Sequence, residues 1–338
     1  MGVTVAVDAN GADLGPAEVA AGAAIAAERG VTVRIYGPAD KIGEVVEGIE
    51  VIDAPVSIAK DADPARAARS TPDASIVQAA RAVAEGEADA LVSAGATGAT
   101  LAAGLFEIRR ARGIYRPALA TPIPIPGNPV TMLDVGANVE VRSEHLVQFA
   151  YMGAALATTV LAQERPRVAL LSNGREASRG TALVIEAGQE LAAARNANFD
   201  FVGNIEGNDI AEGVADVVVT DGFTGNISLK LMEGISQAVV GGIRDAATSS
   251  ARGKLGGALL RPALRGFRDE IDPEGPGGAY LLGLRRLAVV SHGRFSRYGF
   301  SQAILLAARA VSGDLVGQTY AALESGGALR RKGPQQTD

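Results

Sequence analysis

The sequence predicts an α/β fold in which helices cover both faces of a doubly wound, largely parallel sheet. Short apolar runs alternate with helical patterns through most of the 338 residues, and turns that contain glycine follow many of the runs. Hydrophobic residues make up 47% of the chain but aromatic residues only 4%, which predicts a core of Ala, Val, Leu and Ile. This length suits one large α/β unit or two lobes, and we expect residues 1–325 to form a single domain.

The individual strands and helices are predicted in chain order from composition, length and flanking signals. Short, mostly apolar runs that are bounded by turn residues are typical of buried strands. We predict strands at 3–7, 31–36, 88–92, 131–135, 167–172, 214–220 and 287–290. Proline, aspartate or serine near the start of a periodic segment favours the beginning of a helix. Helices are therefore expected from about 16, 38, 100, 143, 181, 227 and 301.

Residues 246–278 differ from the rest of the chain, because arginines and a lysine alternate there with leucines. A helix over this segment would be basic on one side and leucine-rich on the other, with Pro262 limiting its continuity. It is either an ordinary amphipathic helix packed on a neighbour or at a dimer contact, or a protruding helical hairpin that touches a membrane surface or an acidic protein. The polar residues 326–338 are expected to form a disordered tail.

The scarcity of reactive side chains excludes several kinds of catalysis. The chain has no cysteine, which excludes a catalytic cysteine, a disulfide framework, an iron–sulfur cluster and a thiolate zinc site. The two histidines, His145 and His292, cannot supply a three-histidine metal site. We therefore expect no metal and no cofactor. His145 begins a predicted helix, where a capping or surface role is expected.

Charge and targeting signals point to a cytoplasmic protein. The net charge of −6 argues against nucleic acid as the main partner. The N-terminus lacks a basic segment followed by a long apolar stretch, so no secretory signal is expected. The longest uncharged window, 146–163, contains Gln148, Thr158 and Thr159, which favours a buried helix over a membrane span.

Glycine-containing turns after five predicted strands indicate where a ligand would bind. They lie at 8–11, 95–98, 134–138, 221–226 and 291–293, and we expect them to share one edge of the sheet. Backbone N–H groups of such loops and the starts of the following helices stabilise phosphate or another oxyanion. The chain has no GxGxxG in the dinucleotide position, no GxxxxGK[ST] and no GxSxG. The usual dinucleotide site, the P-loop nucleotide site and the α/β-hydrolase nucleophile site are therefore excluded.

Five longer segments then resemble one family. ADALVSAGATGA at 88–99, MLDVGANVEVRSEHLVQFAYMG at 132–153, FVGNIEGNDI at 201–210, VADVVVTDGFTGNISLK at 214–230 and GGAYLLGL…VVSHG at 277–293 occur in the order found in bacterial phosphate acyltransferases of the PlsX type. The opening AVDANGADLGP is similar to that family as well. The resemblance covers nearly the whole chain.

The resemblance implies both a fold and an activity. The fold is a three-layer α/β/α sandwich that is related to phosphate acetyltransferases and to isocitrate-dehydrogenase-like proteins, with the hairpin at about 246–278 as an insertion. The activity is transfer of a fatty acyl group from acyl carrier protein to inorganic phosphate, which gives acyl phosphate for phospholipid synthesis. The implied partners are a second copy in a homodimer, the inner face of the membrane, and a downstream glycerol-3-phosphate acyltransferase.

The resemblance also points to particular site residues. Arg179 occupies the place of the family's loop lysine and keeps its charge. Asn226 either donates to the thioester carbonyl or the phosphate, or caps a helix at Ile227. His292 is expected either as a general acid for the departing thiol or as a phosphate donor, with a structural role as the alternative. The loops supply the substrate-binding residues Asp8, Gly11, Gly95, Thr97, Gly98, Asp134, Gly136, Asn138, Glu176, Asp221, Gly222 and Gly225.

Several departures from the family pattern fall in these loops, among them Arg294 and Phe295 after SHG, where small residues are usual. Asn10 and Ala96 stand where the family has other residues, and Arg179 replaces a lysine. Two alternatives to the first assignment therefore stay open. One is a relative that binds acyl chains or acyl carrier protein without turnover, and the other is a coenzyme A-dependent phosphate acyltransferase on the same fold.

Overall fold

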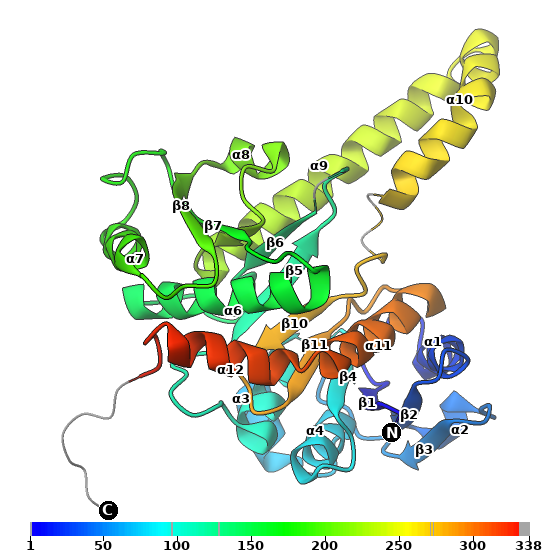
Figure 1. The fold of residues 1–338 in the computed structure, drawn as a ribbon. Helices are drawn as coiled ribbons and strands as arrows, with labels where there is room; N and C mark the ends of the chain where they lie inside the picture. The colour runs from blue at the N-terminus through cyan, green and yellow to red at the C-terminus, as the bar shows by residue number, and fades with distance from the viewer. Residues whose placement is uncertain (1, 96, 128, 271, 273, 331–338) are drawn as a thin grey trace, which may run out of the picture.

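The computed structural model describes residues 2–95, 97–127, 129–270, 272 and 274–330, and within them the strands form one central sheet (Figure 1). Its order is β3-β2-β1-β4-β11-β10-β5-β6-β9-β7-β8. The strands are β1 (Thr4–Asp8), β2 (Thr32–Gly37), β3 (Ile49–Asp53), β4 (Ala90–Ser93), β5 (Ala118–Ile123), β6 (Val130–Leu133), β7 (Arg167–Leu171), β8 (Asp200–Ile205), β9 (Val217–Val219), β10 (Ala279–Leu282) and β11 (Leu287–Val290).

The sheet is largely parallel, as predicted, but it reverses direction in the middle. β1, β2, β3, β4 and β11 run one way, and β6, β7, β8 and β9 form a second parallel group. Between the groups, β10 is antiparallel to β11 and to β5, and β5 is antiparallel to β6. The second group therefore runs opposite to the first. The prediction that all five glycine loops share one edge is wrong, because β5 and β10 were not recognised in the sequence.

Helices cover both faces of the sheet, which confirms the three-layer sandwich. One face packs against α1 (Pro16–Ala27), α2 (Ala39–Ile42), α6 (Ser143–Leu161), α7 (Ala182–Ala193), α11 (Arg297–Ser312) and α12 (Leu315–Ser325). The other packs against α3 (Pro64–Ser70), α4 (Ser75–Glu85), α5 (Thr97–Ala103), the π-helical turn η1 (Gly104–Ile108), α8 (Gly207–Glu212) and α9 (Gly222–Thr248). The uncharged window 146–163 lies mostly in α6, whose residues are largely buried. None of the described helices is long and apolar enough to cross a membrane.

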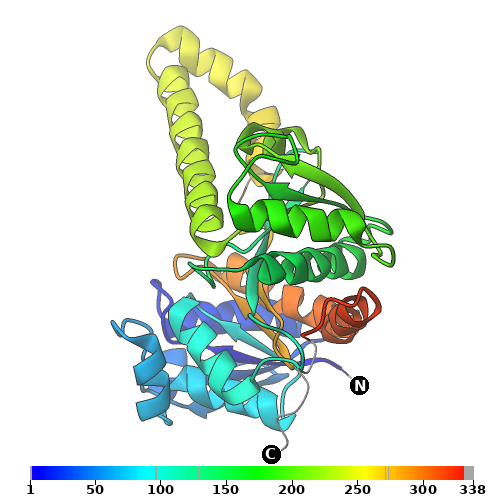
Figure 2. The same cartoon turned by 90° about the vertical axis from the view of Figure 1, so that its left-hand side faces the viewer.

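α9 and α10 (Ala251–Glu270) form a helical hairpin that projects from the sandwich (Figures 1 and 2). The hairpin is longer than the predicted 246–278, because its first arm is the whole of α9 and begins at Gly222 rather than near Ile227. Pro262 lies inside α10 without ending it. The far part of the hairpin projects away from the sandwich, and its described side chains are largely exposed (Figures 1 and 2).

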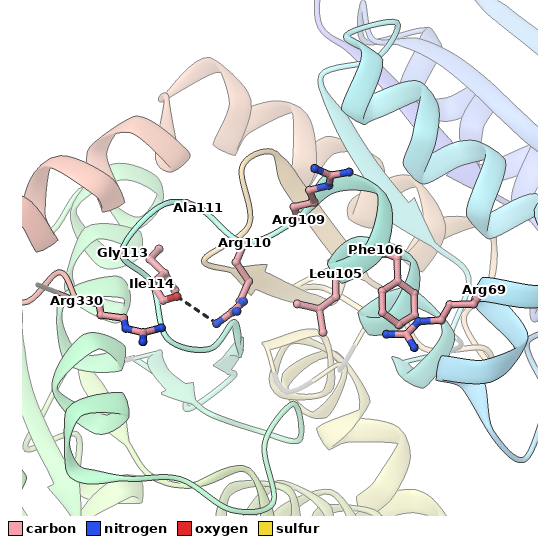
Figure 3. Close-up of a pocket in the computed structure, with 9 residues that line it drawn as sticks. All are labelled: Arg69, Leu105, Phe106, Arg109, Arg110, Ala111, Gly113, Ile114 and Arg330. Carbon is pink, nitrogen blue, oxygen red and sulfur yellow. Dashed lines mark hydrogen bonds between the residues drawn. The ribbon is translucent and has the colours of Figure 1, made fainter. Parts of the chain in front are cut away.

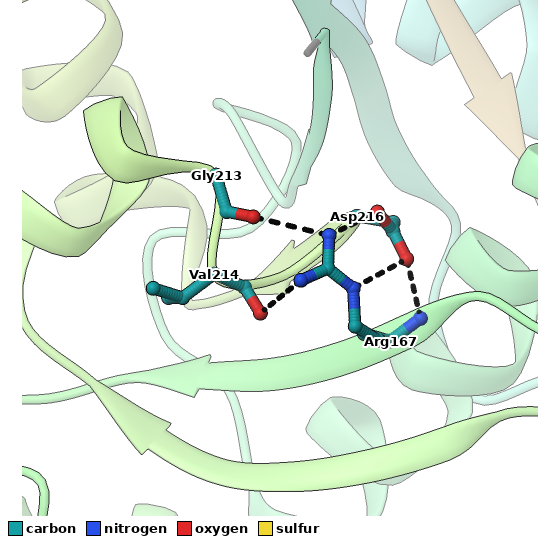
Figure 4. A network of polar contacts seen from close by, with 4 residues as sticks. All are labelled: Arg167, Gly213, Val214 and Asp216. Atoms are coloured by element: carbon teal, nitrogen blue, oxygen red, sulfur yellow. Dashed lines mark hydrogen bonds and ion pairs between the residues drawn. The ribbon is translucent and has the colours of Figure 1, made fainter.

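The second strand group is fastened by a network around a partly exposed arginine (Figure 4). The Arg167 guanidinium donates to both carboxylate oxygens of Asp216, at 2.7 and 3.1 Å, and to the carbonyls of Gly213 and Val214, each at 3.0 Å. The network ties the start of β7 to the segment that leads into β9.

The C-terminal segment is partly ordered, contrary to the disorder expected from residue 326. Arg330 donates its backbone N–H to the Gly113 carbonyl at 2.8 Å, and the Ala328 carbonyl accepts from the Gln148 side chain at 2.8 Å. Residues 326–330 therefore pack on the domain, and the remainder of the predicted tail, 331–338, lies outside the described residues.

Candidate active site

Three of the predicted glycine loops meet at one edge of the sheet, after β1, β4 and β11. A Cβ atom on Gly95 would lie 2.3 Å from the backbone N of Gly293, and one on Gly293 would lie 2.9 Å from the Gly11 carbonyl oxygen. Gly11 and Gly95 also have φ angles of 115° and 110°, which side chains disfavour. Only glycine lets these three backbones approach so closely.

Asp8 lies beneath this first set of loops rather than on its surface. Its carboxylate accepts from Ser75 Oγ at 2.6 Å, from Ser93 Oγ at 3.4 Å and from the Asn10 backbone at 3.2 Å. Burial raises the pKa of Asp8 to about 7, although the hydrogen bonds from Ser75, Asn10 and Ser93 oppose the shift. The Asn10 side chain donates to the Ala54 carbonyl at 3.2 Å. Asp8 and Asn10 therefore hold the first loop in place.

A second set of loops, after β6 and β9, lies at the opposite edge and is built around Asp134. This carboxylate is 0% exposed and accepts from the backbones of Leu119, Gly136, Ala137 and Asn138 at 2.7–3.1 Å, and from the Asn138 side chain at 2.8 Å. Burial raises its pKa, and these donors oppose the shift. Because its carboxylate oxygens already accept these hydrogen bonds, Asp134 positions the loop from inside the protein.

The start of α9 packs directly on this second set of loops. A Cβ atom on Gly222 would lie 2.5 Å from the Asn138 carbonyl oxygen, and one on Gly225 would lie 1.9 Å from the Asp134 carbonyl oxygen. Asp221 caps the helix by accepting from the Thr224 backbone at 2.8 Å. The cap is thus Asp221, and the alternative in which Asn226 caps a helix at Ile227 is wrong.

Asn226 instead lies one turn into α9, with an exposed side chain. A Cβ atom on Gly136 would come within 3.8 Å of Asn226 Oδ1, which places the amide beside the Asp134 loop. Lys230 and Glu233 follow at the spacing that repeats on one helix face, and Lys230 Nζ lies 2.9 Å from Glu233 Oε2. Asn226, Lys230 and Glu233 therefore form a polar row along α9.

This row reaches the first set of loops at its far end. Glu233 Oε2 also lies 3.7 Å from Arg294 Nη2, in the loop after β11. Leu229 and Met232, on the other side of these turns, pack against the sheet. α9 thus joins the two sets of loops: it begins at the Asp134 loop and contacts the loop of His292 and Arg294 about three turns later.

His292 lies among these charges as a half-buried side chain. Its Nδ1 accepts from the Arg294 backbone at 3.4 Å, which leaves the proton of the neutral imidazole on Nε2. Burial lowers the pKa of His292, and the positive charges of Arg294 and Lys230 lower it further, while Glu233 and Asp13 oppose the shift. The imidazole is therefore neutral near neutral pH.

Lys230, Glu233 and Arg294 were not predicted as site residues. The spacing of Lys230 from Asn226 in the segment GNISLK was the available signal, since residues four apart lie on one helix face. The contact between α9 and the loop after β11 was not predictable, because it depends on the reversal of the sheet.

Thr97 and Gly98 begin α5 and are exposed beside the first set of loops. A Cβ atom on Gly98 would lie 2.9 Å from Pro64 Cγ, so α5 packs closely on the start of α3. Ala96, the departure that precedes them, lies outside the described residues.

Arg179 and Glu176 lie apart from this group. Arg179 is 61% exposed at the side chain, its Nε lies 3.6 Å from Glu176 Oε2, and its carbonyl accepts from the Asn204 side chain. Within the described residues, no hydrogen bond or ion pair joins Arg179 to Asn226 or His292. The structure therefore links Asn226 and His292 through α9, and places Arg179 in the separate loop after β7.

His145 has the capping role that the sequence predicts. Its Nδ1 accepts from the Arg142 backbone at 3.2 Å at the start of α6. The side chain is buried between Tyr115 and Phe149, so the alternative surface role is wrong.

The chain matches one protein family over most of its length. The profile of the family described as fatty acid synthesis protein matches residues 3–317. The chain is 46% identical over 296 residues to a phosphate acyltransferase of Lacticaseibacillus casei, covering 86% of each chain. It is 40% identical to a phosphate acyltransferase of Geobacillus thermodenitrificans, covering 95% of this chain and 99% of that one.

Solved structures share the fold at lower identity. The EutD phosphotransacetylase from Staphylococcus aureus superimposes with a TM-score of 0.59 at 20% identity, over 92% of this chain and 94% of that one. A phosphotransacetylase from Streptococcus pyogenes gives a TM-score of 0.61 at 17% identity, with the same coverage. These matches confirm the predicted fold class and the resemblance noted in the sequence. The chain therefore belongs to the fatty acid synthesis protein family.

Proposed function

We propose that this protein transfers a fatty acyl group from acyl carrier protein to inorganic phosphate and releases acyl phosphate for phospholipid synthesis. One observation carries the proposal: Lys230, Arg294 and His292 converge beside glycine loops whose backbones approach within contact distance. Positive charge and backbone N–H groups at helix starts are the features that hold a phosphate dianion. The names of the relatives, phosphate acyltransferase, support the same assignment.

The proposed reaction needs no nucleophile from the protein. An oxygen of hydrogen phosphate attacks the thioester carbonyl carbon, so that a C–O bond forms and the C–S bond breaks. The proton that the phosphate carried passes to the departing sulfur, and the products are acyl phosphate and the free thiol of the carrier. The protein contributes by orienting the phosphate and by donating to the developing oxyanion. A chain without cysteine can carry out this chemistry.

Asn226 and His292 have different parts in the proposed site. The exposed Asn226 amide, at the start of the polar row, donates to the thioester carbonyl oxygen. His292 donates its Nε2 proton to the phosphate. Its lowered pKa supports this role over that of a general acid for the thiol, because an imidazole with a lowered pKa carries no second proton near neutral pH.

The remaining predicted residues act mostly through the backbone. Gly11, Gly95 and Gly98 place N–H groups at the first set of loops, with Thr97, and Gly136, Gly222 and Gly225 do so at the second. Asp8, Asp134, Asn138 and Asp221 position these loops, because their carboxylates or amides are engaged within the protein. We propose that Arg179 attracts phosphate at the rim of the site and that Glu176 is its ion-pair partner.

The role of Arg179 is tested against that of Lys230. Arg179→Ala is expected to raise the phosphate KM by about tenfold, the effect of one lost charge-assisted hydrogen bond. Lys230→Ala is expected to have at least the same effect. Steady-state kinetics with varied phosphate measure both. An unchanged KM in Arg179→Ala would remove that residue from the site without affecting the Lys230 assignment.

The activity itself is tested by trapping the product. The protein is incubated with acyl carrier protein thioester and phosphate, and acyl phosphate is converted to hydroxamate with hydroxylamine. We expect hydroxamate that increases with phosphate. Formation that does not depend on phosphate would contradict the proposal and favour a relative that binds carrier or acyl chain without turnover. Coenzyme A thioesters in the same assay separate the proposed donor from the alternative that the phosphotransacetylase fold suggests.

We propose that the hairpin contacts two further partners, a second copy of the chain and the inner face of the membrane. At the membrane, a downstream glycerol-3-phosphate acyltransferase would use the product. Exposed apolar residues recur every four positions along α9, at Phe223, Ile227, Leu231, Ile235, Val239 and Ile243. Such a row fits a second helix. On α10, exposed leucines lie among arginines, which fits an anionic lipid surface. The protein would thus act in the cytoplasm at the membrane.

A further inference from the structure

A pocket rich in arginine lies at the edge of the sheet where β10 ends and β5 begins (Figure 3). Its volume is about 570 Å³, and Arg69, Arg109, Arg110 and Arg330 line it around Phe106 and Ile114. We call these six residues the arginine pocket. Arg69 lies over the Phe106 ring at 4.3 Å. The pocket is therefore cationic at its rim and apolar at its centre.

The positive charge of this pocket is not neutralised by a carboxylate in the described part of the chain, although the Arg110 guanidinium donates to the carbonyls of Ile114 and Tyr115. Elsewhere arginines pair with carboxylates, as Arg167 does with Asp216 and Arg297 with Glu18. None of the four arginines of the pocket forms such an ion pair among the described residues, and no acidic residue lines the pocket. The whole chain carries a net charge of −6, so this is a local excess of positive charge on an acidic protein.

The pocket is held in shape by a buried glutamine. Gln148 is 1% exposed; its Oε1 accepts from the Tyr115 backbone at 2.8 Å, and its Nε2 donates to the carbonyls of Gly113 and Ala328 at 2.9 and 2.8 Å. One side chain thus joins the loop that carries Arg110 to the C-terminal segment that carries Arg330. The arginines are presented by a fixed scaffold.

Arg109 is held in a strained backbone conformation. Its φ angle is 69°, in the left-handed region that bulky residues avoid at a cost of about 1–3 kcal/mol. Glycine would adopt the same backbone without strain. Backbone strain of this kind is typical of residues whose side chain has a function. The presence of arginine rather than glycine at position 109 is therefore better explained by its charged side chain than by the shape of the turn.

The pocket adjoins the second set of loops of the candidate active site. The segment after Tyr115 leads to Pro117, whose carbonyl accepts from the Asn138 side chain at 2.7 Å, and to Leu119, whose backbone donates to Asp134 at 3.0 Å. A macromolecule bound at the arginine pocket would therefore lie beside the loop that faces Asn226.

We propose that the arginine pocket docks an acidic helix of the protein that carries the acyl group. This rests on the proposed function, in which the donor is a carrier protein. A helix with carboxylates around one apolar side chain matches a cationic rim around an apolar centre. A flat lipid surface would not enter a concave pocket, and a single phosphate ion would not span four arginines.

The test measures the KM values for acyl carrier protein thioester and for phosphate in a variant with fewer positive charges in the arginine pocket. Arg109→Gly removes a charge and relieves the backbone strain, so it should fold at least as well as the wild type. Combined with Arg330→Gln, it is expected to raise the KM for acyl carrier protein thioester at least about tenfold, as loss of interface arginines does. The KM for phosphate should stay unchanged. Arg165→Gln, an exposed arginine on the approach to β7, is the matched control.

Binding is measured separately, with fluorescently labelled acyl carrier protein at several salt concentrations. We expect weaker binding by the double variant and a smaller dependence on salt. Unchanged carrier KM and affinity would overturn the docking proposal while leaving the acyltransferase activity standing. Absence of any phosphate-dependent transfer would instead overturn the proposed function, and the binding measurement would still decide on the pocket. Loss of binding to anionic vesicles with unchanged carrier binding would assign the pocket to lipid and contradict the proposal.

Discussion

At the scale of single residues, the charges around His292 set the pH at which its imidazole takes up a second proton. Lys230 and Arg294 keep the pKa of His292 low, and Glu233 opposes them. Glu233 also pairs with both cations, so its carboxylate occupies a position between Lys230 and Arg294 that an anionic substrate would favour. The protonation of one side chain therefore depends on residues from two elements.

This dependence predicts opposite effects of two substitutions on the pKa of His292. Lys230→Met removes a positive neighbour, so the pKa of His292 should rise. Glu233→Gln removes a negative neighbour, so the pKa of His292 should fall further. Proton NMR titration of His292 checks the assignment, with His145 as the reference because its charged neighbours are Glu144, Arg116 and Arg142. Shifts of the same sign in both variants would contradict the account.

Asp8 predicts a second pH effect, on stability. Its pKa is about 7 in the folded protein, above the ordinary value of 3.8, so folding takes up a proton between these values. The resulting stabilisation is complete below the unfolded pKa and is lost as pH rises through the folded pKa. Relative to Asp8→Asn, the free energy of unfolding of the wild type should therefore increase as pH falls from about 8 to about 5. Denaturant unfolding at several pH values measures it, and a difference that does not vary with pH would contradict the assignment.

At the scale of elements, the sequence predicted most parallel strands and their loops but not the relation between them. The strands 3–7, 31–36, 88–92 and 287–290 were recognisable from apolar runs, and the structure confirms them as β1, β2, β4 and β11. β5 contains Pro122, and β10 follows two glycines, so neither has the usual signal of a strand. Because these two strands reverse the sheet, the opposite edges and the bridging position of α9 could not be predicted.

The site residues were predictable to a similar degree. Asn226 and His292 could be proposed from the resemblance of their segments, and α9 brings both into one region. Arg294 and Glu233 gave no local signal, since their pairing joins two segments far apart in the chain. The prediction of disorder from residue 326 did not foresee the contacts of residues 326–330 for a similar reason. The buried Gln148 that holds this segment lies in α6, far away in the sequence.

The junction between α9 and the Asp134 loop predicts a sharp difference between two glycines of one helix. Gly225→Ala would place Cβ 1.9 Å from the Asp134 carbonyl oxygen, so it should lower stability by about 1–3 kcal/mol and reduce turnover. Gly234→Ala meets nothing within 4 Å and should raise stability by up to about 1 kcal/mol. Thermal unfolding and kcat of both variants test this. Equal stability of the two would mean that α9 does not rest on the loop as described.

At the scale of the whole molecule, the far part of the hairpin, which includes α10, adds no described residue to the hydrophobic core of the sandwich. Its exposed leucines include Leu259, which is 77% exposed, and Leu260. Leu259→Glu combined with Leu260→Glu should weaken binding to anionic vesicles by at least about tenfold, since burial of each leucine contributes about 1.5–3 kcal/mol. Activity away from membranes should stay unchanged. Vesicle sedimentation measures the binding, with Val46→Glu, an exposed residue far from the hairpin in sequence, as the control. Equal binding by the two variants would mean that the tip of the hairpin packs against protein and does not bind the membrane.

The whole molecule is thus a sandwich whose two edges are joined by α9, with a cationic group at one end of the polar row and the arginine pocket beside the other. The measurement that tests this account most directly is ³¹P NMR of the protein with acyl carrier protein thioester and phosphate, with the released thiol measured in parallel. Because the chain has no cysteine, all of that thiol would come from the carrier. The account predicts an acyl phosphate signal that grows in step with the thiol, and that grows more slowly in the Lys230→Ala variant when phosphate is below its KM. Thiol release without an acyl phosphate signal would contradict it.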